Sequence, residues 1–104
     1  MKNFVFIYDN GGEVASLPME EVLAAWTAWF TQLGDKLVDG GNPFNEGAMA
    51  VTKNGVSALK GSPASGYSIV KAESMEKATE LAKGCPMLKH VKNGTVQVYE
   101  ALPM

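Results

Sequence analysis

The sequence predicts an α+β fold in which two helices cover one face of an antiparallel sheet. Residues 2–9 and 66–73 alternate in the manner of strands and are rich in aromatic and β-branched side chains. Residues 18–33 and 74–85 instead repeat apolar side chains at helical spacing. With a length of 104 residues, we expect a single domain over residues 1–104.

The first strand and the first helix are the clearest elements. Residues 2–9 have apolar side chains on both faces, which is typical of a central strand covered on both sides. Pro18 suits the first turn of the helix, and Gly34 can end it. The apolar stripe of this helix contains Met19, Val22, Leu23, Trp26, Phe30 and Leu33. Trp29 lies at the flank of the stripe, where it widens the buried face or contacts a partner.

The remaining elements complete the order strand, helix, strands, strand, helix, strand. A short strand begins near residue 37, and residues 48–60 predict two strands around Asn54-Gly55, a dipeptide typical of a type I′ hairpin. A loop is expected at 61–65 and a strand at 66–73. The second helix then has Ser74 as its N-cap and Gly84 as a left-handed C-cap, and Pro86 prevents it from continuing. A last strand is expected at 94–102.

This order is the pattern of a ferredoxin-like βαββ(β)αβ sandwich, with both helices on one face of the antiparallel sheet. The other face still carries Phe, Tyr or Val side chains, which need a cover. We therefore expect a homodimer that forms through the sheet faces.

Composition narrows the class of protein. Hydrophobic residues make up 46% of the chain and charged residues 19%, below the roughly 25% usual for soluble domains. The chain contains no arginine and its lysines are scattered, so we expect no nucleic-acid partner. The apolar run at the N-terminus is too short for a signal-peptide core or a membrane span. The chain has one cysteine, which cannot form a disulfide within the chain. We expect a cytoplasmic protein with no membrane partner.

Two stretches, "GYSIVKAESMEKATELAKGCP" and "GTVQVYEALP", resemble the C-terminal half of YCII-related proteins, including their DGPF branch. "MKNFVFIYD" is similar to the first strand of that family. The resemblance implies a ferredoxin-like fold, a homodimer with facing sheets (the dimeric α/β-barrel arrangement) and often no established reaction.

The chain departs from both branches of this family. "KGSPASGY" stands where the Asp-Gly-Pro-Phe motif would be. The other branch is thought to use a histidine on the first helix and an aspartate before the proline of the second helix. Here the first helix has no histidine, and Cys85 precedes Pro86, so neither residue of that pair can be carried over.

Cys85 and His90, the only cysteine and the only histidine, are five residues apart. A nucleophilic thiolate needs a base or a helix N-terminus nearby. Cys85 is expected at a helix C-terminus, where the dipole opposes thiolate formation, so we interpret it as a buried, inert thiol. His90 is expected in a polar connector, either as a solvated loop residue or as an acid/base group at the rim of a pocket.

Other candidate sites are weaker. Two potential Cys/His ligands do not make a structural zinc site, and we expect neither a metal nor a cofactor. "DNGGE" (9–13) and "DGGN" (39–42) match no phosphate-binding pattern and are interpreted as turns. A small apolar pocket is expected between the first helix and the sheet. The expected ligand-binding residues are Trp26, Phe30, Tyr67 and Met49; the alternative is that these aromatic residues form only core and dimer interface.

Two functions remain open. The first is a small homodimeric protein that binds a small apolar molecule or acts as an accessory protein, without catalysis of its own. The alternative is a cofactor-independent enzyme, of the YCII lyase or hydrolase type or like a monooxygenase, acting on a small apolar substrate. An enzyme needs convergent acid/base groups, and the sequence offers His90, Asp9 and Asp39.

Overall fold

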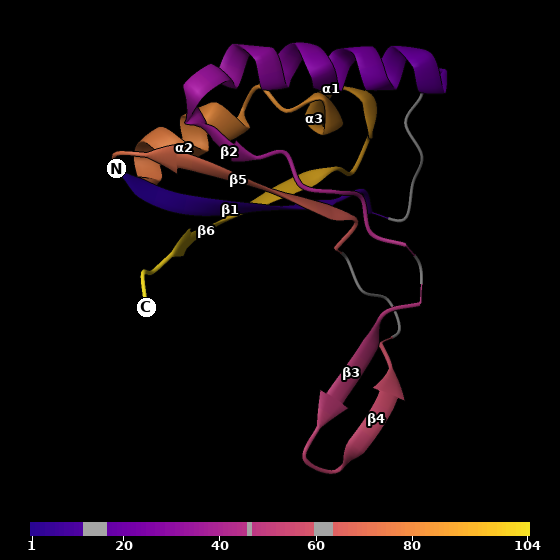
Figure 1. Cartoon of the computed structure of the whole chain (residues 1–104). Helices are drawn as coiled ribbons and strands as arrows, with labels where there is room; N and C mark the ends of the chain where they lie inside the picture. The colour runs from indigo at the N-terminus through magenta and orange to yellow at the C-terminus, as the bar shows by residue number, and fades with distance from the viewer. Residues whose placement is uncertain (12–16, 46, 60–63) are drawn as a thin grey trace.

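The computed structural model describes residues 1–11, 17–45, 47–59 and 64–104. It is a mixed α+β structure with an antiparallel sheet and few helices, as the sequence predicts (Figure 1). The strands are β1 (Lys2–Asp9), β2 (Leu37–Asp39), β3 (Met49–Thr52), β4 (Gly55–Ala58), β5 (Gly66–Ala72) and β6 (Thr95–Ala101). The helices are α1 (Met19–Leu33), the 3-10 turn η1 (Gly34–Lys36), α2 (Met75–Ala82) and α3 (Pro86–His90).

The main sheet has four strands in the order β2-β5-β1-β6, and each neighbouring pair is antiparallel. β1 lies in the interior of the sheet, as predicted, because it pairs with β5 on one side and β6 on the other. All three α-helices lie on one side of this sheet (Figure 1). None of the described helices lies on the opposite side, which we call the open face.

Alternation along β1 separates the two faces of the sheet. Phe4, Phe6 and Tyr8 point toward the helices and are buried, whereas Val5 and Ile7 point to the open face and are half-buried. The same alternation along β5 buries its helix-facing side chains. The core therefore lies between the sheet and the helices, and it contains Phe4, Phe6, Tyr8, Trp29, Leu33, Val70, Ala72, Ala78, Ala82 and Cys85.

The buried face of α1 differs from the predicted stripe. Trp29, expected at the flank, is 3% exposed and is the most deeply buried residue of the helix, whereas Leu23, expected in the stripe, is 59% exposed. The helix is rotated about its axis relative to the prediction, because Trp29 stacks on Phe6 of the central strand with 6.2 Å between ring centroids. Gly34 ends α1 with φ 53°, as predicted.

Residues 48–59 form a hairpin that leaves the main sheet, and we call it the arm. β3 and β4 pair only with each other in a separate two-stranded sheet, which projects from the side of the open face (Figure 1). The hairpin prediction is confirmed, but the type I′ turn is wrong. Lys53 and Asn54 occupy the turn, and neither has the positive φ that this type requires; Gly55 instead takes φ 136°.

The segment after β5 contains two short helices where the sequence predicted one helix and a connector. Ser74 caps α2 as predicted, because its Oγ accepts a hydrogen bond from the Lys77 amide. α2 ends at Ala82, and α3 begins with Pro86 at its first turn. The predicted left-handed C-cap at Gly84 is wrong, since its φ is not positive. Position 84 favours glycine because of packing instead: a Cβ there would lie 2.9 Å from Nε1 of Trp29.

The described residues of both glycine-rich stretches form turns. Asp9 Oδ1 accepts a 2.7 Å hydrogen bond from the Gly11 amide, and Asp39 Oδ1 accepts a 2.8 Å bond from the Gly41 amide. Gly41 has φ 70°, and a Cβ there would lie 1.8 Å from the Tyr67 carbonyl oxygen, so this turn requires glycine. Part of the first turn and part of the loop expected at 61–65 lie outside the described residues.

Candidate functional site

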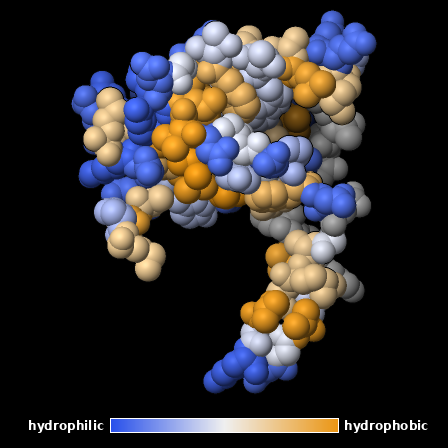
Figure 2. Space-filling model, viewed as in Figure 1, coloured by the Kyte–Doolittle hydropathy of each residue, from blue (hydrophilic) through white to orange (hydrophobic). Residues whose placement is uncertain are grey.

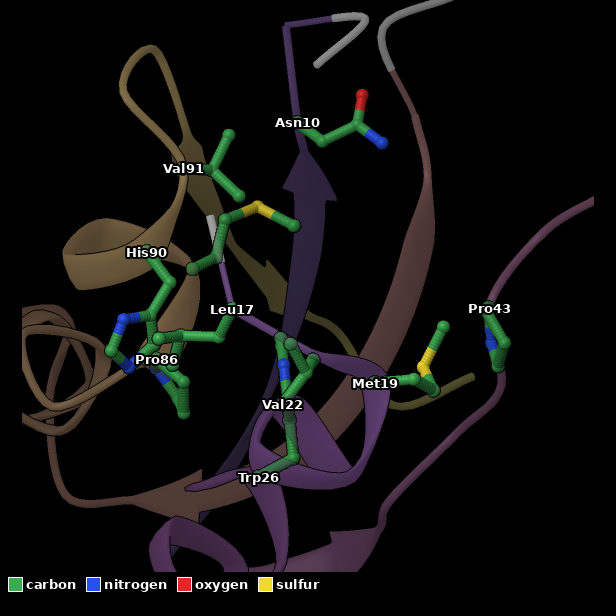
Figure 3. A pocket seen from close by; sticks show the side chains of 10 residues that line it. Asn10, Leu17, Met19, Val22, Trp26, Pro43, Pro86, His90 and Val91 are labelled. Atoms are coloured by element: carbon green, nitrogen blue, oxygen red, sulfur yellow. The ribbon is translucent and has the colours of Figure 1, made fainter. Parts of the chain in front are cut away.

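A half-open cleft of about 530 Å³ lies between the start of α1, α3 and the end of β1 (Figure 3). Its volume lies within the range of about 300–1,000 Å³ that is usual for small-molecule sites. The lining residues are Asn10, Leu17, Met19, Val22, Trp26, Pro43, Pro86, Met87, His90 and Val91. In Figure 3, His90 and Val91 lie on one side of the cleft, and Met19 and Pro43 lie on the opposite side.

The wall from α1 is formed by Trp26, whose ring is held by three aromatic neighbours. Tyr8 meets it edge to face with 4.8 Å between centroids, Trp29 at 5.6 Å and Phe30 at 5.8 Å. Such edge-to-face pairs are favourable beyond the area that they bury. Trp26 is therefore fixed from the core side, while its other side lines the cleft.

The opposite wall comes from α3, which is anchored by Cys85 and Pro86. Both side chains are buried, and the Leu88 amide donates a 3.1 Å hydrogen bond to the Cys85 carbonyl. At the other end of α3, the Val91 amide donates to the Met87 carbonyl at 3.0 Å. This anchoring places the half-buried side chains of Met87 and His90 in the wall of the cleft.

Cys85 is a structural residue rather than a nucleophile. Burial raises the pKa of its thiol to about 12, although hydrogen bonds from the backbone of Met87 and Leu88 act in the opposite direction. The thiol therefore stays protonated at neutral pH, and it does not line the cleft. The predicted buried thiol is confirmed, but its position is different: Cys85 precedes α3 as its N-cap and does not end α2.

Beneath Trp26, a buried pair of hydroxyl groups joins β1 to β5. Tyr8 Oη donates a 2.7 Å hydrogen bond to Ser68 Oγ, and Ser68 Oγ donates a 2.7 Å bond to the Gly40 carbonyl. Burial raises the pKa of Tyr8 far above its usual value, against the opposing effect of the bond to Ser68. The Tyr8 hydroxyl is therefore a neutral donor that is used within the protein, and it is not an acid or base for a ligand.

The residues expected in a site are dispersed, and the cleft brings together only Trp26 and His90. Phe30 lies behind Trp26 and packs against it. Tyr67 stacks on Phe44 at 5.8 Å, in register with Ile7 on the open face. Met49 is exposed on the arm. Asp9 ends β1 and accepts from Gly11, and neither Asp9 nor Asp39 lines the cleft.

Sequence reasoning did not identify Val22, Pro86 and Val91 as lining residues. A signal for two of them was present, because proline is favoured at the first position of a helix: Pro86 begins the segment "PMLKH", and Val91 follows that segment directly. That signal would have predicted α3, and with it a wall close to α1.

The chemistry available in the cleft is mostly apolar contact. Among the described lining residues, the polar side chains are the Asn10 amide, the Trp26 indole and the His90 imidazole, and of these His90 is the one with an acid/base group. Within the described residues, no three His, Cys, Asp or Glu side chains gather as they would around a metal ion. None of the helices in the described ranges has the length and apolar character needed to cross a membrane.

Comparison with known proteins gives no match: no protein-family model, no curated protein and no solved structure is significantly similar to this chain.

Proposed function

We propose that this chain is a small homodimeric binding or accessory protein whose cleft holds a small apolar molecule. The observation that carries the proposal is the cleft of about 530 Å³ between α1 and α3, with a fixed tryptophan in its wall. Ligand sites of this size are mostly apolar and contain a few polar groups that orient the ligand. Asn10 and His90 are those groups here.

The favoured ligand is a flat, apolar molecule with one polar group. Trp26 offers a ring surface, and Val22 and Met87 contribute apolar contact beside it. Trp26 is already held by Tyr8, Trp29 and Phe30, so little side-chain entropy is lost when a ligand packs against it.

We further propose a ferredoxin-like topology of the YCII-related type and a cytoplasmic homodimer that forms through the sheet faces. The strand order β2-β5-β1-β6, with all α-helices on one side, supports the topology. The half-buried Val5 and Ile7 on the open face support an interface there. A free, buried Cys85 is compatible with a reducing compartment.

A second candidate, a cofactor-independent enzyme acting on a small apolar substrate, is favoured by one observation. His90 lies in the wall of the cleft, where its imidazole can exchange a proton with a bound molecule. Asp9, the other proposed acid/base residue, accepts from the Gly11 amide and is not in that wall. Catalysis would therefore depend on His90 and on groups of the substrate itself.

The proposal is tested by thermal-shift measurements with indole and benzoate, using two matched variants of α1. Val22→Phe fills the cleft from its wall, whereas Leu23→Phe adds the same ring one residue later, at an exposed position. We expect a ligand to raise the melting temperature of the wild type and of Leu23→Phe, and to have no effect on Val22→Phe. An equal effect of the ligand on both variants would exclude the cleft as the binding site.

A further inference from the structure

The arm has an apolar face that none of the described residues covers. Residues directly opposite in a hairpin share a face, and the faces alternate along each strand. Met49 is opposite Ala58 and Val51 is opposite Val56, so these four side chains share one face. Met49, Val51 and Val56 are 57%, 76% and 64% exposed. The other face carries Ala50, Ser57, Thr52 and Gly55.

An isolated two-stranded hairpin is marginally stable in water, so the arm gains stability only if another surface covers this face. Figure 2 shows hydrophobic side chains gathered midway along the arm and hydrophilic ones at its tip, with a hollow between the arm and the body. We propose that the arm clasps a second copy of this chain, whose body sits against the open face. This inference rests on the proposed dimer and assigns the arm as part of its interface.

The exposed surface is large enough for a partner of this kind. The chain exposes 7239 Å², whereas a compact monomer of its mass exposes about 5,700 Å². The excess of about 1,500 Å² exceeds the roughly 800 Å² that each partner buries in an interface of standard size. The radius of gyration is 14.7 Å, compared with about 13 Å for a compact domain of this length. A small molecule would cover only a small part of such an excess.

The geometry of the arm favours a second copy over a different protein. The arm projects on the side of the open face, so one body seated there meets both surfaces (Figure 1). A two-fold axis lets each chain cover the other in the same way.

The test is sedimentation equilibrium of the full chain at tens of micromolar with two matched variants. Val56→Lys places a charge on the apolar face, and Ser57→Lys places the same charge on the other face, one residue later. We expect the wild type and Ser57→Lys to be dimers, and the dissociation constant of Val56→Lys to rise at least tenfold. A monomeric wild type overturns both the dimer and the clasp. A dimeric wild type with two equally dimeric variants overturns the clasp alone.

A cross-linking experiment keeps the clasp testable if Val56→Lys fails to fold. Val51→Cys on the arm is mixed with ¹⁵N-labelled Tyr99→Cys, whose substituted position is exposed and in register with Val5 on the open face. Native Cys85 is buried and does not compete for a short bis-maleimide. We expect mixed pairs, identified by mass, in excess of those formed by Ser57→Cys with the same partner. Equal yields contradict the clasp.

Discussion

The Tyr8 hydroxyl donates a 2.7 Å hydrogen bond to Ser68 Oγ across the β1–β5 pair. The Ser68 hydroxyl in turn donates a 2.7 Å hydrogen bond to the Gly40 carbonyl. Ser68 is fully buried. The pair therefore connects three segments of the chain directly below Trp26, which rests edge to face on the Tyr8 ring.

Removing the two hydroxyl groups has unequal effects on stability. Tyr8→Phe removes one donor and leaves Ser68 bonded to Gly40, so we expect a loss of about 1 kcal/mol in the free energy of unfolding. Ser68→Ala leaves both the Tyr8 hydroxyl and the Gly40 carbonyl without this partner, at about 1–3 kcal/mol for each buried group. Urea unfolding measures both variants. A smaller loss for Ser68→Ala than for Tyr8→Phe would contradict this order.

Cys85 makes stability depend on pH in the alkaline range. Burial raises the pKa of its thiol from 9.0 to about 12, so the unfolded chain releases this proton before the folded chain does. The stability that the neutral, buried thiol contributes to the folded state is fully present below pH 9. It is lost as the pH rises toward 12. In that interval we expect Cys85 to lower the free energy of unfolding by up to about 1.4 kcal/mol per pH unit.

Cys85→Ala isolates this contribution, because the ionisation of Tyr8 is common to both proteins. Urea unfolding between pH 8 and pH 11 should give a shallower decline for the variant than for the wild type. If the two proteins declined in parallel, the thiol would not be buried as described.

Gly94 leaves room for Met87 in the wall of the cleft. A Cβ at this position would lie 2.6 Å from Met87 Cγ and 2.8 Å from the Met87 carbonyl oxygen. We expect Gly94→Ala to cost about 1–3 kcal/mol and to weaken binding of indole, because Met87 must move. The control is Lys92→Ala, at an exposed position two residues earlier. Both effects are measured by urea unfolding and by a binding titration, and an unchanged affinity would exclude Met87 from the binding surface.

His90 is expected to hold the polar end of a ligand, because it is one of the few polar side chains in the wall of the cleft. His90→Leu removes the ring nitrogens that can hydrogen-bond to a carboxylate, so we expect it to weaken the binding of benzoate. Indole binds mainly through apolar contact, so its affinity should change little. Binding titrations of wild type and variant with both compounds at one pH are the measurement. Unchanged benzoate binding by His90→Leu would remove His90 from the site.

Local patterns predicted most of the elements, because alternation and helical spacing are properties of short segments. β1, β5, β6 and α1 are found close to their predicted positions. The buried face of α1 was not predicted correctly, since Leu23 and Trp29 each fit an apolar stripe that contains Trp26. Contact with Phe6 decides between the two stripes, and Phe6 lies in a different element. α3 was missed because five residues are too few to show a helical period.

The cleft was harder to predict than the fold. Trp26 and His90 were chosen for their side-chain chemistry, and both line it. Met49 and Tyr67 were chosen for their apolar side chains, but the arm and the open face hold them outside the cleft. The walls come from α1, α3 and segments beside β1 and β2, which only the complete fold brings together.

The central claim, that the cleft binds a small apolar molecule, is tested most directly by the two indole N–H signals in a ¹H–¹⁵N spectrum. Trp26 lines the cleft and Trp29 is buried behind it, so the chain contains its own control. During a titration with indole or benzoate, the Trp26 signal should shift in a saturable manner, with a much smaller shift for Trp29. A Trp26 signal that does not shift, or one that shifts without saturation, would contradict the claim.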